Sequence, residues 1–171
     1  ERVVGASQYD APPELAAVFA EILDPACENL GLLGDIGLPV HYTQGLFYAV
    51  FLRWCSERWK TVFVLAGNHE MYTKEGETHK TVLATIDGLC EALSTANHAM
   101  HHLNCTTVMV GQSLRVTGAT LWTSVPEDDP ETVRSMTWRM TDYKCIVVEN
   151  EDGTRGPYNP LVTKAWYTEQ L

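Results

Sequence analysis

The stretch TVFVLAGNHEMY, residues 61–72, decides how the rest of this sequence is interpreted. It begins with a β-rich apolar run that has the length and composition of a buried strand. Gly67 ends the run and allows close approach of another backbone segment. Asn68, His69 and Glu70 follow directly, at the position where open α/β sheets bind their ligands. The pattern therefore predicts a polar site at the carboxyl end of a strand.

A second apolar run, residues 29–33, ends in the same manner with Gly34 and Asp35. Between the two runs, residues 43–59 carry apolar side chains at helical spacing, which predicts a crossover helix. Strands joined in this way are parallel and end at one edge of the sheet. We therefore expect Asp35 and Asn68 to converge, and a carboxylate there is a hard ligand for a divalent metal.

The Gly34-Asp35 pair, the helix and the Gly67-Asn68-His69-Glu70 block together resemble the calcineurin-like metallophosphoesterases. That family carries five blocks in order: D-x-H, G-D, G-N-H-[ED], a lone H, and G-H-x-H. Only the second and third are present here. Residues 114–123 and 140–143 also look like segments of one branch of predicted phosphohydrolases in this family. The resemblance is strongest over residues 30–72.

The resemblance implies a role for each residue of the two blocks. Asp35 would bridge two metal ions, held ~3.5–4 Å apart in such sites, and Asn68 would be a neutral metal ligand. His69 would act on the phosphate or the leaving oxygen, and Glu70 would orient its neighbours from a second shell. The alternatives are structural: a turn aspartate that caps a helix, a turn asparagine, and a histidine bonded to backbone.

Two departures from the family pattern limit this expectation. Leu38 stands where many relatives have an acidic or amide residue, and no histidine follows His102. The first strand and the D-x-H block would lie immediately before Glu1. A site with two divalent ions (Mn, Fe or Zn) needs more ligands than Asp35 and Asn68. We therefore expect the chain by itself to be inactive and to bind metal only incompletely or not at all.

The remaining pattern predicts an α/β fold for one partial domain, residues 1–171. By resemblance, this is the four-layer α/β/β/α sandwich of the family, incomplete at one side. Helices are predicted at residues 14–23, 78–95, 132–140 and from Pro160 onward, with Asp10 as a cap for the first. Strands at residues 100–103, 106–110 and 114–121 are expected to form a β-meander in a second sheet, with a hairpin turn at Gly111. Residues 144–149 form a further candidate strand, and residues 151–157 a turn or loop.

Composition restricts the possible partners. The 171 residues carry a formal net charge of −10, which argues against non-specific binding to nucleic acid or to an anionic membrane. A phosphorylated small molecule, a nucleotide or a phosphoprotein stays possible as substrate, because bound metal reverses the local charge. No apolar stretch is long enough to cross a bilayer and no signal peptide pattern is present, so a cytoplasmic protein is expected. The five cysteines are widely spaced and are expected to be reduced thiols.

Other polar residues are weaker candidates. His98, His101 and His102 are close enough in sequence to bind a transition metal, but we favour a solvated loop. Asp142 and Tyr143 either contact substrate or simply cap and pack, and the sequence does not distinguish these roles. Trp122 is expected in the core.

Two functions from different classes remain. The first is hydrolysis of a phosphate mono- or diester by a metal-bound hydroxide. The second is a non-catalytic scaffold of the same fold that has lost its metal ligands, which Leu38 and the missing histidine block favour. A nucleotide-binding α/β domain is disfavoured because no G-x-G-x-x-G or G-x-x-x-x-G-K sequence occurs.

Overall fold

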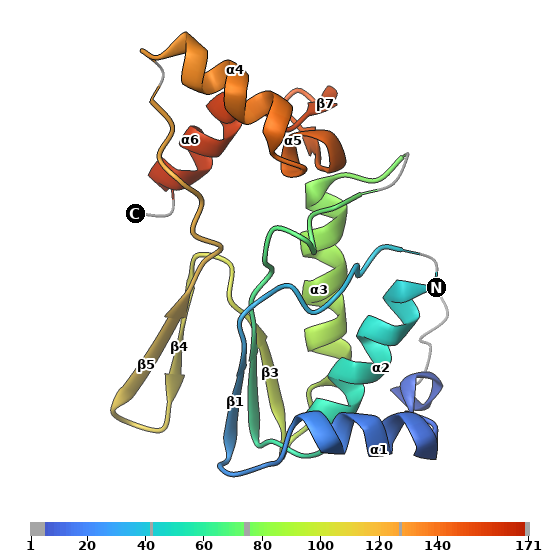
Figure 1. Cartoon of the computed structure of the whole chain (residues 1–171). Helices are drawn as coiled ribbons and strands as arrows, with labels where there is room; N and C mark the ends of the chain where they lie inside the picture. The colour runs from blue at the N-terminus through green and yellow to red at the C-terminus, as the bar shows by residue number, and fades with distance from the viewer. Residues whose placement is uncertain (1–5, 42, 74–75, 127, 170–171) are drawn as a thin grey trace.

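The computed structural model describes residues 6–41, 43–73, 76–126 and 128–169 (Figure 1). The helices are η1 (Ala6–Tyr9), α1 (Pro13–Ile22), α2 (Gln44–Ser56), α3 (His79–Leu93), α4 (Pro130–Arg139), α5 (Asp142–Cys145) and α6 (Pro160–Glu169). The strands are β1 (Asn29–Leu32), β2 (Thr61–Val64), β3 (Ala99–His102), β4 (Thr106–Val110), β5 (Leu114–Gly118), β6 (Val147–Glu149) and β7 (Arg155–Pro157). The chain is therefore α/β, as its pattern predicts.

The central element is a three-stranded parallel sheet in the order β1-β2-β3. Asn29 pairs with Thr61, and Thr61 pairs with Ala99, so the three strands run in register and end at one edge. Helix α2 connects β1 to β2, and α3 connects β2 to β3. The predicted β-α-β unit is confirmed.

The predicted three-stranded meander is wrong. Strand β3 joins the parallel sheet beside β2, because α3 returns the chain to the start of that sheet. Of the three predicted strands, β4 and β5 form an antiparallel hairpin, and its turn contains Gly111 with φ 62°, as expected from the sequence. The second strand of this hairpin ends at Gly118, three residues earlier than predicted.

Helices α2 and α3 cover one face of the parallel sheet, α1 packs against α2, and the β4–β5 hairpin stands away from the other face (Figure 1). Leu52 and Trp54 of α2 and Ile86 of α3 are at most 2% exposed, so they form the centre of the core. Leu46 and Phe47, two of the apolar residues in α2, are 55% and 59% exposed. The residues of α2 that are buried are Tyr48, Ala49, Val50, Leu52, Trp54, Cys55 and Ser56.

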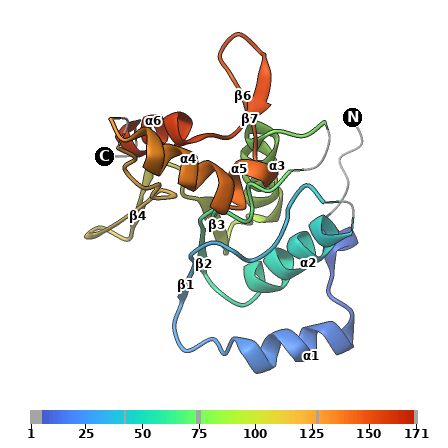
Figure 2. The ribbon, with the colours of Figure 1, turned by 45° about the horizontal axis from the view of Figure 1, so that its top comes forward.

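The C-terminal segment, residues 130–169, gathers beyond the carboxyl end of the parallel sheet (Figures 1 and 2). Its interior is a cluster of aromatic rings in which Tyr158 lies 5.0 Å from Trp122 and 4.9 Å from Trp166, measured between ring centroids. The expectation that Trp122 packs in the interior is met, although its side chain is only half-buried. The predicted loop at residues 151–157 contains strand β7, which pairs with β6.

The first helix is capped differently from the prediction. Residue Pro12 precedes α1, and Asp10 does not cap it. Instead the Asp10 carboxylate pairs with the Arg53 guanidinium of α2 at 3.2 Å. Proline in the first turn needs no hydrogen bond from its own nitrogen, so the helix begins without a side-chain cap. In the part of the chain that the structure describes, no helix has the length and apolar character needed to cross a bilayer.

Candidate functional site

The loops after β1 and β2 are in direct backbone contact. A Cβ atom added to Gly34 would lie 2.6 Å from the nitrogen of Gly67, and one added to Gly67 would overlap the Asp35 carboxylate. The Asp35 Oδ1 atom accepts a hydrogen bond from the backbone nitrogen of His69 at 3.1 Å. Only glycine at these two positions lets the loops approach so closely. The structure thus brings the two predicted blocks together at one edge of the sheet.

Glu70 lies beneath both loops and is fully buried. Its Oε2 atom accepts hydrogen bonds from the backbone nitrogens of Asp35 and Gly67, each at 2.8 Å. Its Oε1 atom accepts from Ile36 at 2.6 Å and from Gly37 at 3.4 Å. A buried carboxylate is costly unless its oxygens are satisfied, and here four N–H groups satisfy them. Glu70 therefore fixes the shape of both loops, which is the supporting geometry expected of it.

Asp35 has a backbone conformation that few residues adopt. Its φ is 57°, in the left-handed region where aspartate, asparagine and glycine are tolerated. The preceding Gly34 also has a positive φ, of 93°. Two successive residues of this kind turn the chain sharply after β1 and leave the Asp35 side chain exposed. The strain is held by the Glu70 contacts, and such strain is typical of functional sites.

Asn68 is half-buried, and its side chain is paired. Its Nδ2 atom donates to Oδ1 of Asp142 at 2.7 Å, and the hydroxyl of Tyr72 donates to the same oxygen at 3.1 Å. Asp142 is 7% exposed. The role that the sequence leaves open for Asp142 is thus a contact with Asn68. Burial and then the hydrogen bond to Asp142 raise the pKa of Tyr72 to about 12.

His69 projects at the surface beside the two loops. Its side chain is exposed, and its ring lies 4.8 Å from the ring of Tyr72. The backbone of His69 contacts Asp35, but its side chain is not part of the cavity described next. An exposed imidazole next to a cavity can still reach a bound molecule, so the position is compatible with proton transfer to substrate.

A cavity of about 270 Å³ opens where the loops meet. Its polar side is formed by Asp35, Asn68 and Thr120, and the Thr120 hydroxyl donates to the backbone oxygen of Ala66. The apolar side chains that line it are Leu33, Leu65, Ala119, Leu121 and Trp122. The cavity therefore combines oxygen-bearing side chains with a surface for a non-polar group.

The side chains here fit part of a metal site. The Asp35 carboxylate and the Asn68 amide oxygen are the donor types that Mn, Fe and Zn accept in mixed sites. Among the described residues, no group of three or more His, Cys, Asp or Glu side chains is placed to hold a metal ion. A stable site requires at least four ligands. Asp35 and Asn68 thus fit as contributors to a metal centre and do not complete one.

The three neighbouring histidines do not form a cluster. His98 Nδ1 lies 2.9 Å from the backbone oxygen of Trp59, and His102 Nδ1 lies 2.8 Å from the Asp87 carboxylate. The ring of His101 stacks on Phe63. The predicted loop position holds for His98, which precedes β3 and is half-buried. It is wrong for His101 and His102, because they belong to strand β3, whose alternation points them to opposite faces.

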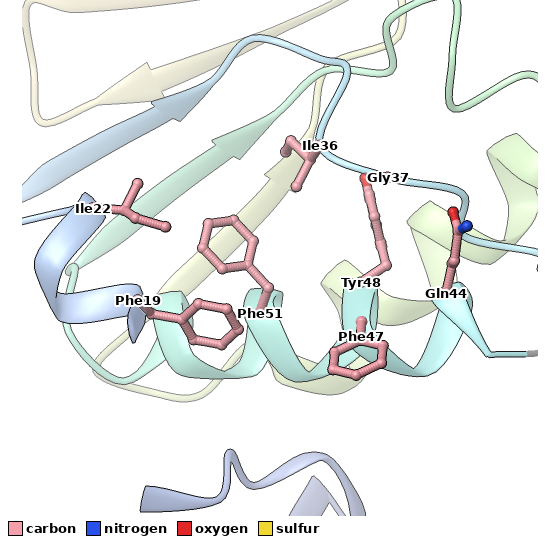
Figure 3. A pocket seen from close by; sticks show the side chains of 8 residues that line it. All are labelled: Phe19, Ile22, Ile36, Gly37, Gln44, Phe47, Tyr48 and Phe51. Carbon is pink, nitrogen blue, oxygen red and sulfur yellow. The ribbon is translucent and has the colours of Figure 1, made fainter. Parts of the chain in front are cut away.

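A larger cavity, of about 410 Å³, lies between α1, α2 and the loop after Asp35 (Figure 3). The rings of Phe19, Phe47 and Phe51 line it, and so does Tyr48, whose pKa is raised by burial and by the nearby Glu70. Neither Asp35 nor Asn68 contributes to it. A third cavity, of about 650 Å³, lies between the parallel sheet and the β4–β5 hairpin and is lined mainly by apolar residues. Both of these cavities exceed the one at the loops, but the smaller one holds Asp35 and Asn68.

Sequence reasoning missed Tyr72 and Thr120 as members of the site. Tyr72 lies at the end of the stretch that carries the motif, two residues after Glu70, but nothing local shows that its hydroxyl is directed to Asp142. Comparisons of the chain with family models, with curated proteins and with solved structures find no match.

Proposed function

We propose that this chain contributes to a metallophosphoesterase, a hydrolase that cleaves a phosphate mono- or diester with the help of two divalent ions. The observation that carries the proposal is the binding of Glu70 to both loops, because it fixes Asp35 and Asn68 at one cavity. In this proposal Asp35 and Asn68 are metal ligands and Glu70 supports them. The full arrangement would be the four-layer α/β/β/α sandwich, with further ligands from outside the described residues.

The role of each group in this proposal follows from its chemistry. Bound Mn, Fe or Zn would activate water and neutralise the charge of the phosphate. His69, exposed beside the cavity, would donate a proton or a hydrogen bond to the leaving oxygen. The apolar side of the cavity would accept the organic part of the substrate. Phosphorylated small molecules, nucleotides and phosphoproteins all satisfy these requirements.

The first test is residue-specific detection of Mn²⁺ binding by the 171-residue chain. Paramagnetic Mn²⁺ broadens NMR signals close to it, so binding should broaden the backbone amides of residues 34–37 and 67–69. The broadening should be lost in Asp35→Asn and weakened in Asn68→Ala. Asp152→Asn is the matched control, since it removes one exposed carboxylate in the β6–β7 turn. Broadening that is the same in all four proteins would contradict the proposal.

The second test is turnover. Aryl phosphate monoesters and diesters would be offered, with and without Mn²⁺, to the chain and to the protein that contains it. Metal-dependent hydrolysis by the containing protein, abolished by Asp35→Asn, is the expected result. Unchanged turnover in that variant would refute the assignment.

A non-catalytic scaffold of the same fold is the second candidate. It is favoured by the small number of donors, since only Asp35 and Asn68 provide metal-type oxygens to the cavity. A folded containing protein that binds no Mn²⁺ and hydrolyses neither ester would favour this role.

A further inference from the structure

Asp142 reaches the candidate site from a distant part of the chain. It is the first residue of α5 and lies 74 residues after Asn68, yet its Oδ1 atom is 2.7 Å from the Asn68 amide nitrogen. Its side chain does not line the cavity, and the residue is 7% exposed. A buried carboxylate at this place contacts the predicted metal ligand and not the solvent.

The chemistry of the pair sets the orientation of the Asn68 amide. An ionised carboxylate only accepts hydrogen bonds, whereas an amide has one donating and one accepting end. In the structure the Asn68 side chain presents Nδ2 to Asp142, which leaves its Oδ1 atom on the other side of the amide. Oδ1 is the atom that would bind a metal. An Asn68 without this partner could rotate its amide by 180° at little cost.

Tyr72 helps to hold the Asp142 carboxylate in the position that orients the Asn68 amide. Its hydroxyl donates to Asp142 Oδ1 at 3.1 Å. Oδ1 of Asp142 therefore accepts two hydrogen bonds, one from Asn68 and one from Tyr72, and the carboxylate is held from two directions.

The backbone around Asp142 is anchored to the segment that carries Asn68 and Tyr72. Thr73 donates through its backbone nitrogen to the Cys145 oxygen at 2.9 Å, and its hydroxyl accepts from the Val147 nitrogen at 3.2 Å. The Tyr143 hydroxyl lies 3.1 Å from the Thr163 hydroxyl of α6. Asp142 is thus presented by a fixed support.

We propose that Asp142 is a positioning residue, which holds the amide of Asn68 with its oxygen toward the cavity shared with Asp35. The inference rests on the proposed function, because the orientation matters for chemistry when Asn68 binds a metal. The orientation itself can be measured without metal.

The experiment follows the side-chain NH₂ signals of Asn68 by ¹⁵N NMR in the full chain, assigned by their loss in Asn68→Ala. In the wild type these protons should exchange with solvent more slowly than those of the exposed Asn97. Asp142→Leu removes every acceptor at similar volume and should abolish the protection. Asp152→Asn should leave it intact. Exchange as fast as that of Asn97 in the wild type, or protection that survives Asp142→Leu, would overturn the inference.

A swap of the side chains at positions 68 and 142 tests the same inference if the Asp142→Leu variant does not fold. Asn68→Asp places two carboxylates side by side and should lower the melting temperature, whereas the double variant Asn68→Asp/Asp142→Asn restores a donor and an acceptor. The double variant should recover most of the loss. Additive losses would mean that the two side chains do not interact and would overturn the inference.

The metal readout separates this inference from the proposed function. If both hold, Asp142→Leu should weaken Mn²⁺ binding about 10- to 100-fold, as for other groups that orient a ligand. If the wild type shows no local Mn²⁺ broadening while its Asn68 amide depends on Asp142, the metal role fails and the positioning stands. If Mn²⁺ binds equally well to Asp142→Leu, the positioning role fails and the metal role stands.

Discussion

The two carboxylates of the candidate site, Glu70 below the loops and Asp35 above them, are used in opposite ways. Glu70 is fully buried and directs both oxygens to backbone N–H groups. Asp35 is exposed, accepts a hydrogen bond from the backbone nitrogen of His69, and lines the cavity. The comparison shows that one block supplies a carboxylate that builds the site and the other supplies a carboxylate that can act in it. Stability and chemistry are therefore separable at neighbouring positions.

The largest effect is expected from Glu70→Gln. The amide presents an NH₂ group to two backbone donors whichever way it turns, so two N–H groups lose their acceptor. At about 1–3 kcal/mol for each of the two unsatisfied buried groups, the free energy of unfolding should fall by about 2–6 kcal/mol. Urea denaturation followed by circular dichroism measures this. A loss below about 0.5 kcal/mol would mean that Glu70 does not hold the loops together.

Gly67→Ala should have the next largest effect. The new Cβ would overlap the Asp35 carboxylate and lie 2.8 Å from the Asp35 nitrogen, so the loops must separate. Forcing a group into such a tight contact costs about 1–3 kcal/mol. Gly88→Ala in α3 is the matched control, because a Cβ there meets nothing within 4 Å and improves helix propensity. The same denaturation experiment should show destabilisation for the first variant and none for the second.

Asp35→Asn makes the same chemical change as Glu70→Gln and sharpens the comparison directly. Asparagine tolerates a positive φ and its oxygen still accepts from His69, so the free energy of unfolding should change by at most about 0.5 kcal/mol. The variant should nevertheless lose the Mn²⁺ broadening described above. Destabilisation as large as that of Glu70→Gln would show that the two carboxylates share one structural role.

The smallest effect on stability is expected from His69→Ala. The side chain is exposed and its described ring contact is with Tyr72, so the change should stay within about 0.5 kcal/mol. In the containing protein, turnover should fall by a factor of about 10² to 10⁴, as for a general acid. Full turnover in this variant would remove His69 from the proposed mechanism.

The sequence predicts the part of the site that depends on strand ends. Two apolar runs that end in glycine, joined by a helical pattern, are sufficient to place Asp35 and Asn68 at one edge. The same reasoning fails for β3, because a short apolar run before a hairpin does not reveal whether it pairs in parallel with β2 or antiparallel with β4. It also fails for Asp142, since no local pattern connects residues 74 positions apart.

The way in which Glu70 binds the neighbouring loop has a consequence for how this site can evolve. Its partners at positions 35, 36 and 37 are backbone nitrogens, which every amino acid except proline provides. Selection could therefore exchange the side chains at positions 36 and 37 without disturbing the carboxylate beneath them. Fewer residue types are tolerated at position 35, because its positive φ favours aspartate, asparagine and glycine. A lineage could gain or lose a metal ligand there in one step while the loop keeps its shape.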